Sequence, residues 1–174
     1  MTKAVFLDRD GTLIEEVNYL SNIDDLKIFR YSFDAVKILN KLNFKVIVIT
    51  NQSGIGRKYF NKEFVERTHN LISEIFLKNN AVIHDFYYCP HLPDDNCECR
   101  KPKTGMVNKA VEKYGIDVSK SFFIGDSAKD VETGLNSGIF PIQVLTGHGR
   151  KERDKSSVIT LNIYTAALLI KNFS

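Results

Sequence analysis

Residues 4–12 read AVFLDRDGT, and this stretch decides the fold class. Its first four residues are all apolar, which is typical of a strand buried on both faces of a parallel sheet. Asp8 and Asp10 follow directly, and Gly11 comes next. In open α/β sheets, ligands bind outside the carboxyl ends of the strands. The stretch therefore predicts a buried strand that delivers two carboxylates to a binding crevice.

Four more short apolar runs resemble this first strand, and helical patterns alternate with them. The runs are residues 44–49, 86–88, 122–124 and 142–145. Apolar residues at helical spacing predict a helix capped by Ser32, one capped by Asn61, and one over 105–114 that stops at Gly115. Two more are predicted after Asp126 and after Asn162. Such alternation indicates an α/β domain with a mostly parallel sheet.

Length and composition limit the possibilities. The chain has 174 residues, 43% hydrophobic and 26% charged, so we expect one globular domain over 1–174. No apolar run approaches the roughly 20 residues that span a bilayer, and the first residues do not resemble a secretory signal. We therefore expect a cytoplasmic protein without a membrane partner. We also expect a monomer. The net charge of +3 is spread along the chain, which argues against a nucleic-acid surface.

Polar residues follow three of the predicted strands, and the parallel sheet would bring them together. They are 8–12, 50–53 and 125–126. Asp8, Asp10 and Asp126 would repel one another, and Mg2+ relieves such repulsion while binding carboxylates, water and substrate phosphate. A chance Asp-x-Asp pair in a turn is the alternative, but the position after an apolar strand favours the metal site.

These residue types suit phosphoryl transfer. With Mg2+ present, one carboxylate can attack phosphorus while a second handles the proton of the leaving group. Thr50 and Asn51 can donate hydrogen bonds to the phosphoryl oxygens, and Lys101 can supply positive charge. A merely solvated basic run over 100–103 is the alternative for Lys101.

The three cysteines of the chain lie close together in the sequence, beside a histidine. Cys89, His91, Cys97 and Cys99 provide the four ligands of a closed zinc site, which is structural because no position remains for substrate. An odd number of cysteines argues against a disulfide framework. The alternative is a loop of reduced, unligated cysteines.

Four segments together resemble the successive motifs of the haloacid dehalogenase (HAD) superfamily. They are residues 8–12, 50–54, 100–102 and 125–130. The cysteine loop resembles the zinc loop of the branch that holds D-glycero-D-manno-heptose 1,7-bisphosphate phosphatase and histidinol-phosphate phosphatase. The resemblance implies a Rossmann-like HAD fold with helices on both faces of the sheet and a zinc loop in place of a large cap.

The resemblance also implies roles for individual residues. Asp8 would be the nucleophile and Asp10 the general acid and then base. Asp8, the backbone carbonyl of Asp10, and Asp126 would hold Mg2+. Thr50 and Lys101 would stabilise the transferring phosphoryl group, and Asp130 would orient the site. Substrate contacts would come from Tyr19, Asn51, Gln52, Ser53, Arg57 and Arg100.

The implied activity is hydrolysis of a sugar phosphate monoester through an aspartyl-phosphate. The resemblance favours the 7-phosphate of D-glycero-D-manno-heptose 1,7-bisphosphate, on the nucleotide-heptose route to lipopolysaccharide. Histidinol-phosphate phosphatase, a nucleic-acid 3'-end phosphatase and a non-catalytic zinc-stabilised module are the alternatives. Gly56, Val17 and Asn18, and Ser127 depart from the heptose pattern. We expect His69 and His84 to be partly buried or surface histidines rather than catalytic ones, and His148 to lie in a loop after a strand.

Overall fold

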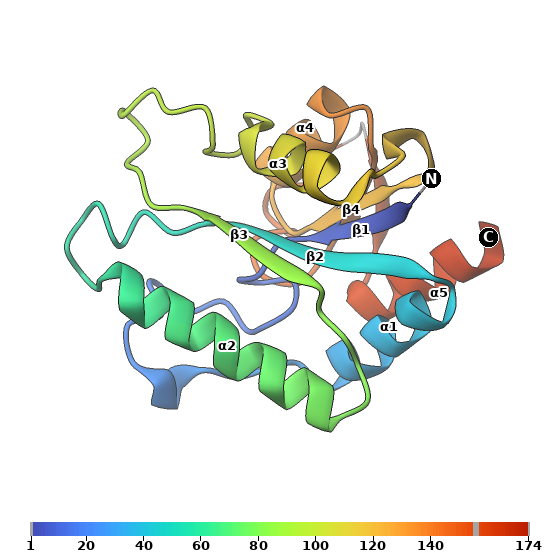
Figure 1. The fold of residues 1–174 in the computed structure, drawn as a ribbon, viewed down its shortest axis with the longest axis horizontal. Helices are drawn as coiled ribbons and strands as arrows, with labels where there is room; N and C mark the ends of the chain where they lie inside the picture. The colour runs from blue at the N-terminus through green and yellow to red at the C-terminus, as the bar shows by residue number, and fades with distance from the viewer. Residues whose placement is uncertain (1, 155–156, 174) are drawn as a thin grey trace.

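The computed structural model describes residues 2–154 and 157–173. Over these residues the strands form one parallel sheet in the order β3-β2-β1-β4-β5-β6 (Figure 1). The strands are β1 (Lys3–Leu7), β2 (Phe44–Asn51), β3 (Asp85–Cys89), β4 (Phe122–Gly125), β5 (Phe140–Val144) and β6 (Val158–Thr160). Because the strands are parallel, their carboxyl ends share one edge. The order reverses between β1 and β4, which is where such sheets bind ligands.

Helices cover both faces of the sheet, as predicted. On one face lie α1 (Arg30–Lys41), α2 (Lys62–Lys78) and α5 (Ile163–Phe173), and on the other lie α3 (Gly105–Tyr114) and α4 (Ala128–Asn136) (Figure 1). Two short 3-10 helices, Ile23–Asp25 and Val118–Lys120, belong to the connections. The fold is therefore the three-layered, Rossmann-like α/β arrangement that the sequence predicts.

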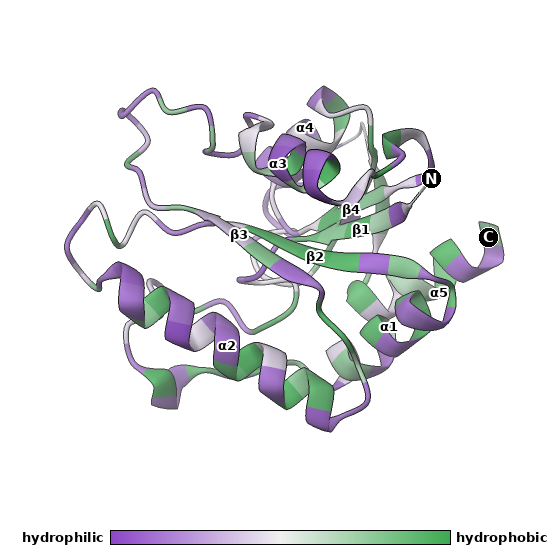
Figure 2. Ribbon diagram, viewed as in Figure 1, coloured by the Kyte–Doolittle hydropathy of each residue, from purple (hydrophilic) through white to green (hydrophobic). Residues whose placement is uncertain are grey.

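The core has two parts, one on each face of the sheet. Val5 and Leu7 of β1 pack among α1, α2 and α5, while Ala4 and Phe6 pack toward α3. All four side chains are fully buried. Successive side chains of a strand point to opposite faces, so a strand buried on both sides must be apolar throughout. Figure 2 shows the apolar colouring along the central strands and the mixed colouring of the helices around them.

Two local predictions about α1 and β5 are wrong. Ser32 does not cap α1, which begins at Arg30 with Phe29 as its N-cap. Ser32 is buried inside the helix, where its hydroxyl donates to the carbonyl of Leu13 over 2.9 Å. Strand β5 begins at Phe140, ahead of the predicted start, and the predicted strands do not include β6.

Other helix ends agree with the prediction. The side chain of Asn61 caps α2 by accepting from the backbone N–H of Phe64 over 2.9 Å. Gly115 ends α3 in the left-handed conformation, with φ of 62°, which glycine adopts without steric cost. Within the part of the chain that the structure describes, no helix combines the length and the apolar character needed to span a bilayer.

Candidate active site

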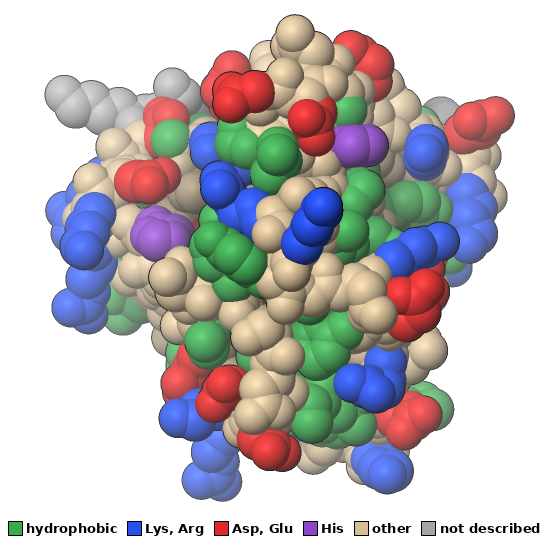
Figure 3. Space-filling model, turned by 90° about the vertical axis from the view of Figure 1, so that its left-hand side faces the viewer, with side chains coloured by type: hydrophobic (Ala, Val, Ile, Leu, Met, Phe, Trp, Pro, Cys, Tyr) green, Lys and Arg blue, Asp and Glu red, His purple; other side chains and the backbone are tan. Residues whose placement is uncertain are grey.

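A cavity of about 330 Å³ opens at the carboxyl edge of the sheet, beside the ends of β1, β2 and β4. Figure 3 looks onto this edge, where basic side chains lie beside acidic and histidine side chains in the upper half of the view. Ten of the residues predicted for the site line the cavity: Asp8, Asp10, Tyr19, Thr50, Asn51, Gln52, Ser53, Arg100, Lys101 and Asp126. The parallel topology thus brings together residues that are distant in the sequence.

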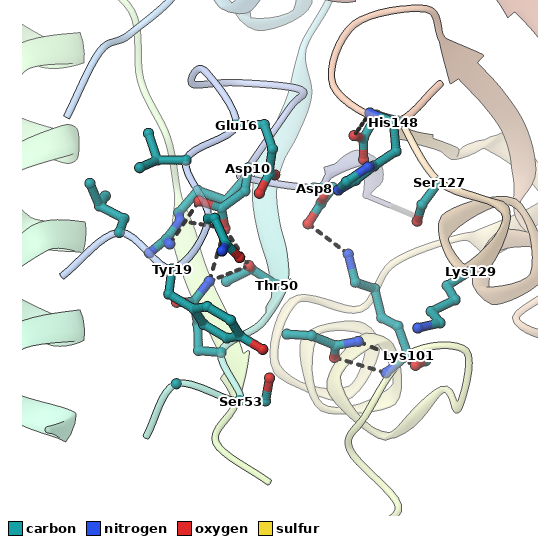
Figure 4. Close-up of a pocket in the computed structure, with 18 of the residues that line it drawn as sticks. Asp8, Asp10, Glu16, Tyr19, Thr50, Ser53, Lys101, Ser127, Lys129 and His148 are labelled. Atoms are coloured by element: carbon teal, nitrogen blue, oxygen red, sulfur yellow. Dashed lines mark hydrogen bonds and ion pairs between the residues drawn. The ribbon is translucent and has the colours of Figure 1, made fainter. Parts of the chain in front are cut away.

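The most buried charges of the site are joined by one lysine. Lys101 donates to Asp8 over 2.7 Å (Figure 4) and to Asp130 over 2.6 Å. The exposed fractions of these three side chains are 4%, 11% and 1%. Burial alone would lower the pKa of Lys101, but Asp130 and Asp8 together raise it, so the ammonium stays charged. Lys101 is thereby fixed beside Asp8 at the end of β1.

Three carboxylates converge at this lysine and could hold a metal ion. Oxygens of Asp8, Asp126 and Asp130 lie within 4.8 Å of one another. Burial raises the pKa of Asp8 well above its usual value, and Asp130 and Asp126 raise it further against the opposing effect of Lys101. Burial and Asp130 raise the pKa of Asp126 to about 6. Burial is the largest cause of both shifts, and the neighbouring carboxylates add to it. Three buried carboxylates beside one lysine form an environment that a divalent cation stabilises.

Two glycines make room for the carboxylate of Asp126. Gly11 has φ of +77° and Gly147 has φ of +51°, and a Cβ atom at either position would overlap the Asp126 carboxylate. The backbone N–H of His148 donates to Asp126 over 2.7 Å. The loop after β1 and the loop after β5 therefore close around this carboxylate and fix its direction.

Asp10 is held by a different set of donors. Arg9 donates from Nε and Nη2 to the two oxygens of Asp10 over 3.0 and 2.9 Å. Gln52 donates to Asp10 over 2.9 Å and to the hydroxyl of Thr50 over 2.9 Å. The Asp10 carboxylate is thus oriented by the end of β2 as well as by its neighbour in sequence.

Asn51 connects the end of β2 to the backbone of Lys101. Its side-chain oxygen accepts from the N–H of Lys101 over 3.0 Å, and its amide nitrogen donates to the carbonyl of Lys101 over 3.2 Å. We expected Asn51 to contact substrate, and it lines the cavity. Its amide also fixes the backbone that carries Lys101.

The mouth of the cavity is polar and is built by loops. In Figure 4, Tyr19 and Ser53 lie on one side of Asp8, and Ser127 and Lys129 lie on the other. Tyr19 has a φ of 59°, and its ring meets the ring of Tyr59 edge to face at 4.9 Å. Arg57 lies outside the cavity wall, with its guanidinium carbon 5.8 Å from the centre of the Tyr19 ring.

The cysteine loop brings its four predicted ligands together. Sulfur atoms of Cys89 and Cys99 each lie 3.6 Å from that of Cys97. The Nδ1 atom of His91 lies 3.5 Å from the sulfur of Cys89 and 3.2 Å from that of Cys99. A tetrahedral zinc ion with Zn–S near 2.3 Å and Zn–N near 2.0 Å implies ligand separations of roughly 3.5–3.8 Å. Three of these four separations lie in that range, and only the one between His91 and Cys99 is shorter. The residues therefore fit a closed zinc site.

The cysteine loop also reaches the cavity. Arg100 donates to the backbone carbonyl of His91 over 3.2 Å. Arg100 follows Cys99 directly and lines the cavity together with Lys101. The loop geometry therefore determines where both basic side chains lie.

Several residues of this site are not predicted from the sequence. Arg9 and His69 form a buried contact behind Asp10, and Glu16 and Lys129 line the cavity. Burial and then Asp10 raise the pKa of Glu16 to about 7. Arg9 was visible as a basic residue between two aspartates, but no periodicity placed Glu16 or Lys129. Their positions depend on loop conformation.

Comparisons with known proteins agree with this geometry. Residues 3–158 match the family described as polynucleotide kinase 3 phosphatase. The chain is 36% identical to D-glycero-alpha-D-manno-heptose-1,7-bisphosphate 7-phosphatase of Photorhabdus laumondii, with 97% of each chain covered. It is 37% identical to D-glycero-beta-D-manno-heptose-1,7-bisphosphate 7-phosphatase of Pseudomonas aeruginosa, with 83% of this chain and 82% of that protein covered.

A solved structure has nearly the same fold. The D,D-heptose 1,7-bisphosphate phosphatase of B. bronchiseptica, complexed with magnesium and phosphate, superposes with a TM-score of 0.93 at 27% identity. The match covers 99% of this chain and 100% of that one. Sequence and structure together show that this chain belongs to the polynucleotide kinase 3 phosphatase family of HAD phosphatases and is a phosphoric monoester hydrolase.

Proposed function

We propose that this chain is a Mg2+-dependent phosphatase that removes the 7-phosphate of D-glycero-D-manno-heptose 1,7-bisphosphate through an aspartyl-phosphate at Asp8. The observation that carries the proposal is the buried cluster of Asp8, Asp126 and Asp130 around Lys101, at the floor of a polar cavity. The substrate follows from the relatives, which are named heptose bisphosphatases.

The residues of the site fit a bound Mg2+ ion. Asp8 and Asp126 would hold it together with the backbone carbonyl of Asp10, and the B. bronchiseptica relative was crystallised with magnesium and phosphate. When bound, the ion neutralises charge on the phosphoryl oxygens and aligns the phosphate. Lys101 supplies further positive charge at the same place, and the hydroxyl of Thr50 can donate to a phosphoryl oxygen.

The carboxylates of Asp8 and Asp10 carry out the bond-making and proton-transfer steps. An oxygen of Asp8 forms a bond to phosphorus while the bond from phosphorus to the sugar oxygen breaks, and protonated Asp10 gives its proton to that leaving oxygen. In the second half of the reaction, Asp10 takes a proton from water as the water attacks phosphorus and releases Asp8. Proton transfer requires Asp10 to lie within hydrogen-bond distance of the leaving oxygen. The hydrogen bonds from Arg9 and Gln52 fix the direction of the Asp10 carboxylate and so suit it to this transfer.

Residues at the cavity mouth are suited to a sugar with a second phosphate. Arg100 and Lys129 present cationic groups, and Tyr19, Asn51 and Ser53 present hydrogen-bonding groups, all around one cavity. The guanidinium of Arg100 can make two parallel hydrogen bonds to a phosphate. We propose contacts from these residues and from Gln52, with Arg57 acting through the Tyr19 ring. The wider setting that we propose is a cytoplasmic, monomeric enzyme on the nucleotide-heptose route to lipopolysaccharide.

We also propose a structural zinc ion at Cys89, His91, Cys97 and Cys99. The separations between their sulfur and nitrogen atoms support it. The set is closed, so the ion would stabilise the loop and take no part in the chemistry.

A panel of phosphate esters tests the proposed function. Phosphate release would be measured with Mg2+ from both anomers of the heptose bisphosphate, from fructose 1,6-bisphosphate, from histidinol phosphate and from a 3'-phosphorylated oligonucleotide. We expect the highest kcat/KM with a heptose bisphosphate, no activity without a divalent cation, and none in Asp8→Asn. Preference for histidinol phosphate or for the oligonucleotide would overturn the substrate assignment.

A further inference from the structure

Arg9 lines the cavity and forms a buried connection between Asp10 and helix α2. Arg9 is only 2% exposed, although it lies between two residues of the active site. Its Nε and Nη2 atoms both donate to Asp10, so two parallel hydrogen bonds fix the plane of that carboxylate. Its third nitrogen, Nη1, points to a different partner.

That partner is His69 of α2. The Nε2 atom of His69 lies 3.2 Å from Nη1 of Arg9. A guanidinium has donors and no acceptor, so Nε2 must accept, and the ring must be neutral with its proton on Nδ1. Burial and then the charge of Arg9 lower the pKa of His69 to about 3, in agreement with a neutral ring at pH 7.

Aromatic side chains of β3 fix the His69 ring in turn. It stacks on Phe86 at 4.6 Å between ring centres with an angle of 18° between the planes, and it meets Tyr88 edge to face at 5.8 Å. His69 is 5% exposed. A path of contacts therefore leads from β3 through His69 and Arg9 to Asp10. Arg9 and Asp10 line the cavity, whereas His69 does not.

We infer that His69 is a positioning residue for Asp10: its Nε2 atom accepts from Arg9 and so holds the guanidinium in the orientation that aims the Asp10 carboxylate at the leaving-group oxygen. The inference rests on the proposed role of Asp10 as proton donor and acceptor. Without the Nε2 acceptor of His69, the Nη1 donor of Arg9 would be buried without that hydrogen bond. A buried donor that lacks a partner is destabilised, which favours rotation of the guanidinium away from Asp10.

The test compares two substrates of similar shape and different leaving-group basicity, phenyl phosphate and p-nitrophenyl phosphate. The p-nitrophenolate anion needs little protonation as it leaves, so a misaligned acid matters less for that substrate. For His69→Leu we expect kcat with phenyl phosphate to fall about tenfold and kcat with p-nitrophenyl phosphate to fall about twofold or less. General acid catalysis typically contributes about 10²–10⁴-fold to the rate, and a displaced acid loses part of that contribution.

Two further variants separate positioning from structure. His69→Gln keeps a side-chain acceptor and should recover most of the lost kcat with phenyl phosphate. It also keeps the test available if His69→Leu fails to fold. His84→Gln is the matched control, because His84 is a half-buried histidine that accepts from the backbone N–H of Val46, outside the cavity. It should change neither kcat.

The outcomes distinguish this inference from the proposed function. Equal losses on both substrates in His69→Leu, no loss on either, or failure of His69→Gln to recover kcat while folded would overturn the positioning role. Asp10→Asn measured in parallel should lose more kcat with phenyl phosphate than with p-nitrophenyl phosphate. If Asp10→Asn loses both equally, the acid role of Asp10 itself fails, and the inference about His69 fails with it.

Discussion

Replacement of Lys101 by methionine tests the electrostatics at the centre of the site. Methionine is similar in length to lysine but carries no charge, so Lys101→Met leaves Asp8 and Asp130 facing each other without their shared cation. The lysine is 4% exposed and bonds both carboxylates at 2.7 and 2.6 Å. Removal of one partner from a buried ion pair costs about 3–5 kcal/mol, because the remaining charge is left uncompensated.

We expect Lys101→Met to lower the free energy of unfolding by about 3–5 kcal/mol at pH 7, which is a factor of roughly 150 to 5,000 in the ratio of folded to unfolded protein. Urea unfolding followed by circular dichroism, without added Mg2+, measures this change. Added Mg2+ should stabilise Lys101→Met more than it stabilises the wild type, since three carboxylates without the lysine attract a cation more strongly.

Lys103→Met is the matched control. Lys103 lies two residues away on the same loop, but it is 44% exposed and pairs with Glu98, which is 87% exposed, over 2.9 Å. Exposed pairs contribute about 1 kcal/mol or less. If Lys101→Met cost no more stability than Lys103→Met, the reasoning about the buried charges would be refuted.

Three further predictions follow from the structure. Protein purified without chelator should contain about one zinc ion per chain by elemental analysis. Removal of the zinc should lower activity, because Arg100 is hydrogen-bonded to the cysteine loop at the carbonyl of His91. Zinc-free protein of full activity would contradict this. Arg100→Ala should reduce kcat/KM for the natural ester much more than for p-nitrophenyl phosphate, which has no distal groups to bind; equal losses would assign Arg100 to the phosphoryl centre. His69 has a folded-state pKa of about 3 and an unfolded value near 6.5, so the unfolded chain binds the proton first and stability falls as pH drops through that window. From pH 7 to pH 5 this loss is about 2 kcal/mol, and His69→Gln should remove it in urea unfolding at both pH values; an unchanged pH dependence would count against a neutral, buried ring.

The parts of the fold that could be predicted are those with a clear apolar pattern. Strands β1, β2, β4 and β5 are buried and apolar over most of their length, and half-buried β3 is marked by its aromatic residues. The side chain of Asn61 and the left-handed backbone of Gly115 are typical of helix ends. Strand β6 has three residues that are exposed or half-buried, so no burial pattern marks it. Ser32 misled the prediction because its hydroxyl bonds the distant carbonyl of Leu13, a contact that only the tertiary structure creates.

Part of the candidate site could also be predicted from the sequence, whereas another part depends on tertiary contacts. Asp8, Asp126 and Lys101 could be predicted to meet, because residues after parallel strands share one edge and because the family resemblance adds Lys101. The pairing of Arg9 with His69 could not be predicted, because it depends on how α2 lies across β3. The sequence predicts a partly buried or surface His69, whereas His69 is buried and contacts Arg9, which in turn bonds Asp10.

The central claim is that Asp8 becomes phosphorylated during turnover. Rapid acid quench of the enzyme with ³²P-labelled substrate and Mg2+, followed by mapping of the labelled peptide, tests it most directly. We expect a label on the peptide that contains Asp8. It should be sensitive to hydroxylamine, as an acyl phosphate is, and absent from Asp8→Asn. A wild-type enzyme that releases phosphate while its Asp8 peptide never carries label, at quench times shorter than one turnover, would contradict the account.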